Sequence, residues 1–241
     1  MGLSSSLSRA LKAHHTLRYN ASLPISIEVL EEAGYGRYKL KVGHKEMITR
    51  SQKVLHVKER YWGNFSESKE GILTISHLRK KPDLLQHDAG LLPMDSFGLL
   101  DLLLYAKTPS LVFKQWLLEQ LCLAEEKHHF QTLSSMLLAL HEGIVHLPLR
   151  IEGRAFLIQW KENKSLNEPL VHFYLAYENL GALQGTLYLM RKTIHLETLF
   201  ERTATFLAHH TANFPLPLSL EANQSVAPLW EGNHALLDLR G

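Results

Sequence analysis

The spacing of apolar residues along the chain changes twice and divides it into three parts. In the first part apolar and polar residues alternate, as in ISIEV at 25–29 and YKLKV at 38–42. A period of two is typical of strands that bury one face. Segments rich in Gly, Ser and Lys separate these runs and favour tight turns. We therefore expect residues 23–81 to form a small antiparallel, barrel-like β domain.

In the second part apolar residues recur three or four positions apart, which is the spacing of an amphipathic helix. A break at about 82–92, which contains Pro, Asp and Gly, precedes this part. The pattern predicts helices at about 96–106, 109–129 and 130–141. We therefore expect a helical segment over residues 92–143.

The alternating pattern returns after Gly143. It predicts five strands, then a helix at 201–214 that Pro215 ends, and a last strand at 216–222. We expect an α+β domain over 145–241, with a mostly antiparallel sheet and one helix, so the whole chain is assigned to the α+β class. The core side chains expected in this domain are Phe173, Leu175, Leu187, Leu189, Ile194 and Leu196.

The composition is that of an ordinary globular protein. Of 241 residues, 45% are hydrophobic and 21% are charged, with a formal net charge of +2, which argues against bulk disorder. Cys122 is the single cysteine, so no internal disulfide is possible and a reducing compartment is indicated. Residues 1–22 have the Ser-rich composition of a mobile leader. The apolar runs are too short to span a bilayer, and we expect a cytoplasmic protein.

The sequence contains no established motif for metal or nucleotide chemistry. The chain has 15 histidines, but HEGIVH at 141–146 has the wrong spacing for a zinc-binding helix, and Gly143 interrupts that helix. We find neither a Gly-rich nucleotide loop nor a Gly-x-Ser-x-Gly nucleophile motif. We therefore expect no metal, no cofactor and no enzymatic activity.

One stretch of the first part is strongly basic. Between residues 35 and 62 the sequence has eight Lys and Arg residues but only two glutamates, and aromatic residues lie among them. Cations interleaved with aromatic rings suit a barrel that binds single-stranded nucleic acid, whose bases stack on the rings. The same alternation also fits a strand with one wet and one buried face, so both interpretations stay open. The nucleic-acid contacts would be Lys39, Lys41, Arg50, Tyr61 and Trp62.

The last part of the chain resembles a known family in the order of its elements. An opening strand (HLPLRIEG) and a second strand (AFLIQW) precede a third strand that ends in a Leu-Gly step (VHFYLAYENLG). A hairpin, a helix and a further strand follow, and then an Asp-Leu-Arg ending. This order is similar to that of the C-terminal domain of flagellar hook-length control proteins, the FliK-like family. A looser similarity links GYGRYKLKVGHKE at 34–46 to the β domain of longer relatives.

The resemblance implies a function in protein–protein contact. Domains of this family contact the cytoplasmic domain of the export-gate membrane protein of the flagellar type III apparatus, and they switch export from rod-hook to filament subunits. Family members typically also carry a long disordered N-terminal region that is exported and measures the hook. Because only a short leader is present here, the resemblance implies substrate-specificity switching more than hook measurement, and export of the chain stays open. The contact residues expected are Asn179, Leu180, Gly181, Glu201, Arg202, Thr205 and His209.

Overall fold

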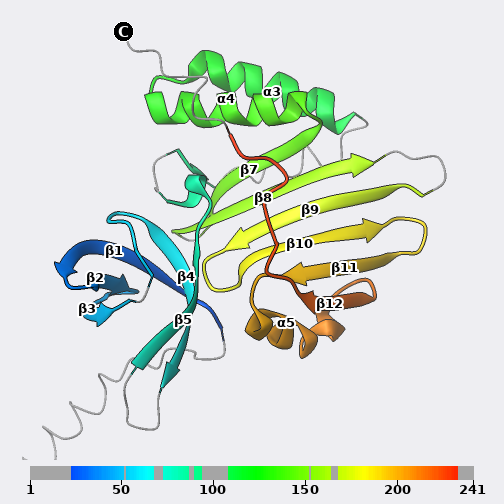
Figure 1. The fold of residues 1–241 in the computed structure, drawn as a ribbon. Coiled ribbons are helices and arrows are strands. Elements are labelled where there is room, and N and C mark those ends of the chain that lie inside the picture. The colour runs from blue at the N-terminus through cyan, green and yellow to red at the C-terminus, as the bar shows by residue number, and fades with distance from the viewer. Residues whose placement is uncertain are drawn as a thin grey trace, which may run out of the picture.

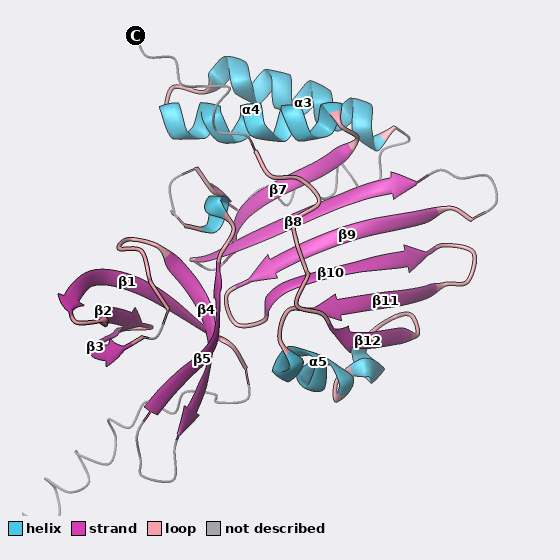
Figure 2. Ribbon diagram, viewed as in Figure 1, coloured by secondary structure: helices cyan, strands magenta, loops and turns pink. Residues whose placement is uncertain are grey.

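The computed structural model contains two β-sheets that lie beside one another, with helices flanking the larger sheet (Figure 1, Figure 2). The α+β class predicted from the sequence is confirmed. The expected leader at 1–22, the expected helix at 96–106 and the Asp-Leu-Arg ending lie outside the described residues. The structure describes residues 23–51, 53–67, 73–86, 90–93, 108–151, 153–163 and 168–232.

The N-terminal sheet has five antiparallel strands in the order β3-β2-β1-β4-β5. In the described residues its edge strands β3 and β5 do not pair, so the barrel closure predicted from the sequence is not observed. β3 contributes Met47 to the core and exposes most of its other residues, so closure would bury little apolar surface there. The strands are β1 (Ile25–Gly34), β2 (Arg37–Val42), β3 (Lys45–Arg50), β4 (Arg60–Glu67) and β5 (Leu73–Lys80).

The alternation in the sequence places the core of this sheet on one face. Ile27 and Val29 of β1 lie directly opposite Val42 and Leu40 of β2. All four side chains are at most 1% exposed. Cross-strand apolar pairs of this kind fix the register, because a slip by one residue would turn every one of them toward water.

The larger sheet has seven strands in the order β12-β11-β10-β9-β8-β7-β6. Strands β7 to β11 form an antiparallel meander, and β6 and β12 run parallel to their neighbours. The helical segment expected over 92–143 is wrong at its start, because Leu92 pairs with Leu149 as part of β6. The strands are β6 (Leu92–Pro93), β7 (Ile144–Ile151), β8 (Arg154–Asn163), β9 (Leu170–Tyr177), β10 (Gly181–Tyr188), β11 (Thr193–Thr198) and β12 (Leu218–Ala222).

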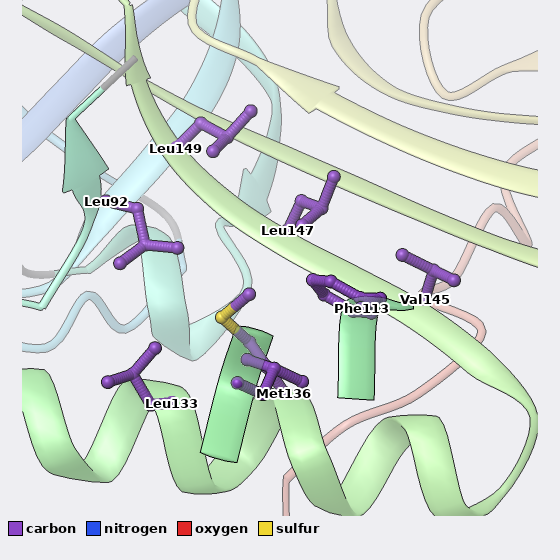
Figure 3. Packing of buried hydrophobic residues seen from close by; sticks show 8 residues of the cluster. Leu92, Phe113, Leu133, Met136, Val145, Leu147 and Leu149 are labelled. Carbon is purple, nitrogen blue, oxygen red and sulfur yellow. The ribbon is translucent and has the colours of Figure 1, made fainter. Parts of the chain in front are cut away.

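Helices α3 (Pro109–Leu123) and α4 (Lys127–His141) pack on the β7 side of this sheet (Figure 1). Figure 3 shows the side chains of both helices meeting those of β7 in one apolar cluster. The expected boundary near residue 130 is wrong, because α3 ends at Leu123 and the chain turns before Lys127. The buried residues of the cluster are Leu92, Phe113, Leu117, Leu133, Met136, Val145, Leu147 and Leu149.

Helix α5 (Glu201–Ala208) connects β11 to β12 and is shorter than the predicted helix at 201–214. Thr203 and Leu207 hold α5 on the sheet, whereas residues 208–213 are exposed, so no buried contact stabilises a further turn there. A short 3-10 turn at Thr211–Asn213 follows. Among the described helices, none is both long and apolar enough to cross a membrane.

The two sheets share a core. Trp62 of β4 and Leu85 of a 3-10 turn (Asp83–Leu85) are buried against side chains of the larger sheet. The start of the expected break at 82–92 is therefore packed rather than exposed. Gln86 reinforces it, because its side-chain amide donates to the carbonyl of Lys81 and its oxygen accepts from the amide of Arg60. The partners are Ala155, Leu157, Tyr174, Ala176 and Ala182 of the larger sheet and Phe200, which precedes α5.

Candidate functional site

The Leu-Gly step forms the turn between β9 and β10 and is hydrogen-bonded to α5. Gly181 has a φ of +75°, and a Cβ there would lie 2.7 Å from the ring of Phe200. The carbonyl of Leu180 accepts a hydrogen bond of 2.8 Å from the hydroxyl of Thr203 on α5. Gly181 is buried, which contradicts the contact role expected for it, whereas Leu180 is half-buried and keeps part of its surface accessible. They fix where α5 begins relative to the sheet.

The other predicted contact residues lie beside this turn. Glu201, Thr205 and His209 are exposed on the side of α5 that faces away from the sheet. Asn179 is exposed in the turn itself, and Arg202 is half-buried. The Leu180–Thr203 hydrogen bond holds the turn against the first turn of α5. We name Asn179, Glu201, Thr205 and His209 together the α5 surface.

Half-buried apolar side chains cover the sheet beside α5. Trp160 lies opposite Phe173 on the neighbouring strand, and Ile158 lies opposite Leu175. All four are half-buried, so each keeps part of its surface accessible. Phe173 and Leu175 pack toward α5, while Ile158 and Trp160 pack toward α3 and α4. This apolar row therefore extends the surface available to a partner beyond α5.

The core expected for this domain is confirmed in part. Leu196 is buried, and Phe173, Leu175, Leu187 and Ile194 are half-buried. Leu189 is 46% exposed, so its assignment to the core is wrong. The reason is local, because β10 ends at Tyr188 and Leu189 already belongs to the hairpin turn.

The basic face of the N-terminal sheet carries its own counter-charges. Lys39 forms an ion pair of 2.8 Å with Glu46, and this hydrogen bond lowers the pKa of the Glu46 carboxyl and raises that of the Lys39 ammonium. Lys41 lies opposite Glu28 on one neighbouring strand and Glu46 on the other. Arg50 is exposed at the end of β3. The sheet therefore presents mixed charge where the sequence suggested a cationic surface.

The aromatic side chains expected to stack on bases are not accessible. Tyr61 is 7% exposed and Trp62 is 1% exposed. Tyr61 donates its hydroxyl hydrogen to Glu59 at 2.7 Å, and Trp62 packs into the core shared by the two sheets. Stacking requires an open ring face, so the predicted contacts of these two residues with nucleic acid are wrong.

A cavity of about 660 Å³ lies where the two sheets meet. Trp62, Leu157, Tyr174 and Ala182 line it, and the indole Nε1 of Trp62 is buried with no hydrogen-bond partner in the described residues. Burial raises the pKa of the Tyr174 hydroxyl, and the negative charge of Glu231 adds to the effect. The phenol therefore stays neutral. These groups suit the binding of a small polar group rather than acid–base catalysis near neutral pH.

The chain after β12 forms one wall of this cavity. Residues 223–232, which we name the strap, cross the face of the larger sheet toward α4 (Figure 1). Gln159 holds the strap, because its oxygen accepts from the amides of Leu229 and Trp230 and its nitrogen donates to the carbonyl of Trp230. Pattern analysis missed Gln159, since a polar residue inside an alternating strand gives no sign of a partner 70 positions away.

A buried histidine supports the same contact. The side-chain nitrogen of Gln159 lies 2.8 Å from His146 Nδ1, and the ring of His146 packs edge-on against Trp230. Desolvation lowers the pKa of His146 to about 3, so its ring is neutral. His146 belongs to the HEGIVH motif. Because it is buried next to the strap, we assign it a packing role.

One group of side chains has the composition of a metal site. His195, Glu197 and Glu221 place one potential ligand atom each within 4.8 Å of the others. The sequence did not indicate this group, because Glu221 is brought to β11 by the parallel pairing of a strand more than 20 residues away.

Comparison with known proteins adds no family to these observations. No family model matches the chain, and neither a curated protein nor a solved structure matches it significantly. The assignment of function therefore rests on the residues of the chain and on their arrangement.

Proposed function

We propose that the chain is a FliK-like component of flagellar or related type III export that acts by protein–protein contact. One observation carries the proposal: β9, the Leu-Gly turn, β10, β11, α5 and β12 follow one another along the chain, and the four strands lie in a single sheet. This is the order of elements on which the resemblance to the family's C-terminal domain rests. The proposed role is substrate-specificity switching or hook-length control, without catalysis.

The proposed partner is the cytoplasmic domain of the export-gate membrane protein, which would place the chain in the cytoplasm. The proposed contact is the α5 surface, with the adjoining apolar row as its less polar part. Exposed polar side chains next to half-buried aromatic ones match the usual composition of an interface, in which aromatic anchors lie inside a polar rim. The Leu180–Thr203 hydrogen bond supports the proposal because it fixes the orientation of α5 on the sheet.

The α5 surface can be tested without disturbing the fold. Glu201→Lys combined with Thr205→Lys changes two exposed residues, so the purified variant should keep its circular dichroism spectrum and melting temperature. A cell that carries this variant should continue to export hook protein, fail to export flagellin and lose motility. Gln115→Lys combined with Glu119→Lys makes an equivalent change on the exposed side of α3 and serves as the control. Normal flagellin export by the α5 variant at wild-type protein level would contradict the proposed contact surface.

No structural observation favours nucleic-acid binding over this proposal. The stacking residues Tyr61 and Trp62 are buried, and Lys39 and Lys41 lie among glutamates. Phosphate attraction by the remaining exposed cations would be weak and unspecific. We therefore do not propose a second function.

A further inference from the structure

Three potential metal ligands meet on the outer strands of the larger sheet. His195 and Glu197 are two residues apart on β11, so their side chains leave the same face. The register pairs Glu197 with Glu221 on β12. His195 Nε2 lies 3.6 Å from Glu197 Oε1 and 3.9 Å from Glu221 Oε1. One imidazole nitrogen and two carboxylate oxygens therefore converge from two strands.

The hydrogen bonds of His195 indicate which ring nitrogen faces the carboxylates. Ser219 lies opposite His195, and its hydroxyl oxygen is 2.9 Å from His195 Nδ1. The same hydroxyl donates its one hydrogen to the carbonyl of Ile194. Its oxygen therefore accepts from Nδ1–H, so Nε2 is the ring nitrogen that faces the two carboxylates. Nε2 beside two carboxylate oxygens is balanced by a cation, either a proton on the ring or a metal ion, and an orienting hydrogen bond on the other nitrogen is typical of metal-bound histidine.

Glu197 is oriented from outside the group as well. Its Oε2 accepts hydrogen bonds from the amide of Gln184, at 3.0 Å, and from the amide of Asn223. Gln184 belongs to β10, and Asn223 begins the strap. These two donors occupy one carboxylate oxygen and turn Oε1 toward His195. Such support of a ligand by neighbouring side chains is what a metal site needs for defined geometry.

We propose that His195, Glu197 and Glu221 bind a divalent first-row transition-metal ion that joins β12 to β11. The imidazole nitrogen favours Zn²⁺ and its neighbours in the series over Mg²⁺ and Ca²⁺, which prefer oxygen ligands alone. Bonds of about 2.0–2.2 Å to nitrogen and oxygen place ligand atoms roughly 3–3.6 Å apart in tetrahedral or octahedral sites. The side chain of Glu221 is 56% exposed, so it can make the small movement required. Water completes the coordination.

The ion has a structural consequence for the edge of the sheet. β12 has five residues and is an edge strand. A bound ion links β12 to β11 directly and, through the Glu197–Asn223 hydrogen bond, to the start of the strap. Because ligands that bind the folded state stabilise it, the melting temperature should rise with the concentration of metal.

Equilibrium dialysis of the full chain against Zn²⁺, with any affinity tag removed, tests the proposal. We expect one equivalent of bound Zn²⁺, an increase in melting temperature, and d–d absorption bands when Co²⁺ replaces Zn²⁺. Glu197→Gln and Glu221→Gln should each weaken binding at least tenfold and abolish the thermal shift. His172→Ala is the control, because His172 lies on the same sheet face, two strands from His195, and is hydrogen-bonded to Thr186.

Two results would overturn the proposal. The first is the absence of bound Zn²⁺ in the wild-type chain, which would mean that His195 is simply protonated and paired with the two glutamates. The second is Zn²⁺ binding that both glutamine variants retain, which would assign the ion to other histidines. Glu221→Gln changes an exposed side chain, so its circular dichroism spectrum should match the wild type and loss of binding would report on the site.

Discussion

Gly181 satisfies two separate requirements of the turn between β9 and β10. Its φ of +75° belongs to the left-handed region, which costs an L-residue about 1–2 kcal/mol. Its position also leaves no room for a Cβ, because the ring of Phe200 would lie 2.7 Å away. Phe200 is 2% exposed and precedes α5, so the ring cannot easily move aside. The glycine therefore couples the turn to the start of the helix.

The two requirements can be separated by a pair of substitutions. Gly153 has a similar φ of +77°, but a Cβ there meets nothing within 4 Å. Gly153→Ala should cost about 1–2 kcal/mol of the free energy of unfolding, from backbone strain alone. Gly181→Ala should cost about 1–3 kcal/mol more, because it adds overpacking against Phe200. Urea denaturation of both variants measures the difference, and equal losses would show that Phe200 does not confine this turn.

At the scale of elements, most strands were predicted correctly from the sequence. Their apolar and polar residues alternate, and this alternation matches the two faces of a strand in the folded sheet. The strands at 37–42 and 193–198 follow the periodicity closely. Features that depend on partners far along the chain were not predictable. β6 has two residues, too few for any period, and forms because Leu92 pairs with Leu149. Burial of Trp62 likewise depends on a second sheet, which local spacing cannot reveal.

The strap is attached to the larger sheet mainly through one side chain, that of Gln159. Gln159→Leu would leave the amides of Leu229 and Trp230 without acceptors, which costs about 1–3 kcal/mol for each buried group. Hydrogen exchange at these two amides should then accelerate strongly, while the amides of β8 and β9 stay protected. Gln184→Leu is the matched control, because Gln184 holds the strap through the exposed amide of Ala227. Equal exchange in both variants would contradict the central role of Gln159.

At the scale of the whole molecule, the shared core makes the two sheets one structural unit. Trp62 and Leu85 from the N-terminal part are buried against the sheet that carries α5. The N-terminal sheet thereby supports the face of the larger sheet that the strap crosses, while α5 packs beside β11 and β12 (Figure 1). This arrangement fits a protein whose folded body orients one contact surface toward a partner.

The central claim is that the α5 surface serves to switch the substrate specificity of a type III export apparatus. Electron microscopy of cells from which the gene for this chain has been deleted tests it most directly, with the wild-type gene restored on a plasmid as the control. The account predicts that the deletion strain continues to assemble hook protein, carries no filaments and is non-motile, and that the plasmid restores filaments. Filaments of normal number and length in the deletion strain would contradict the account.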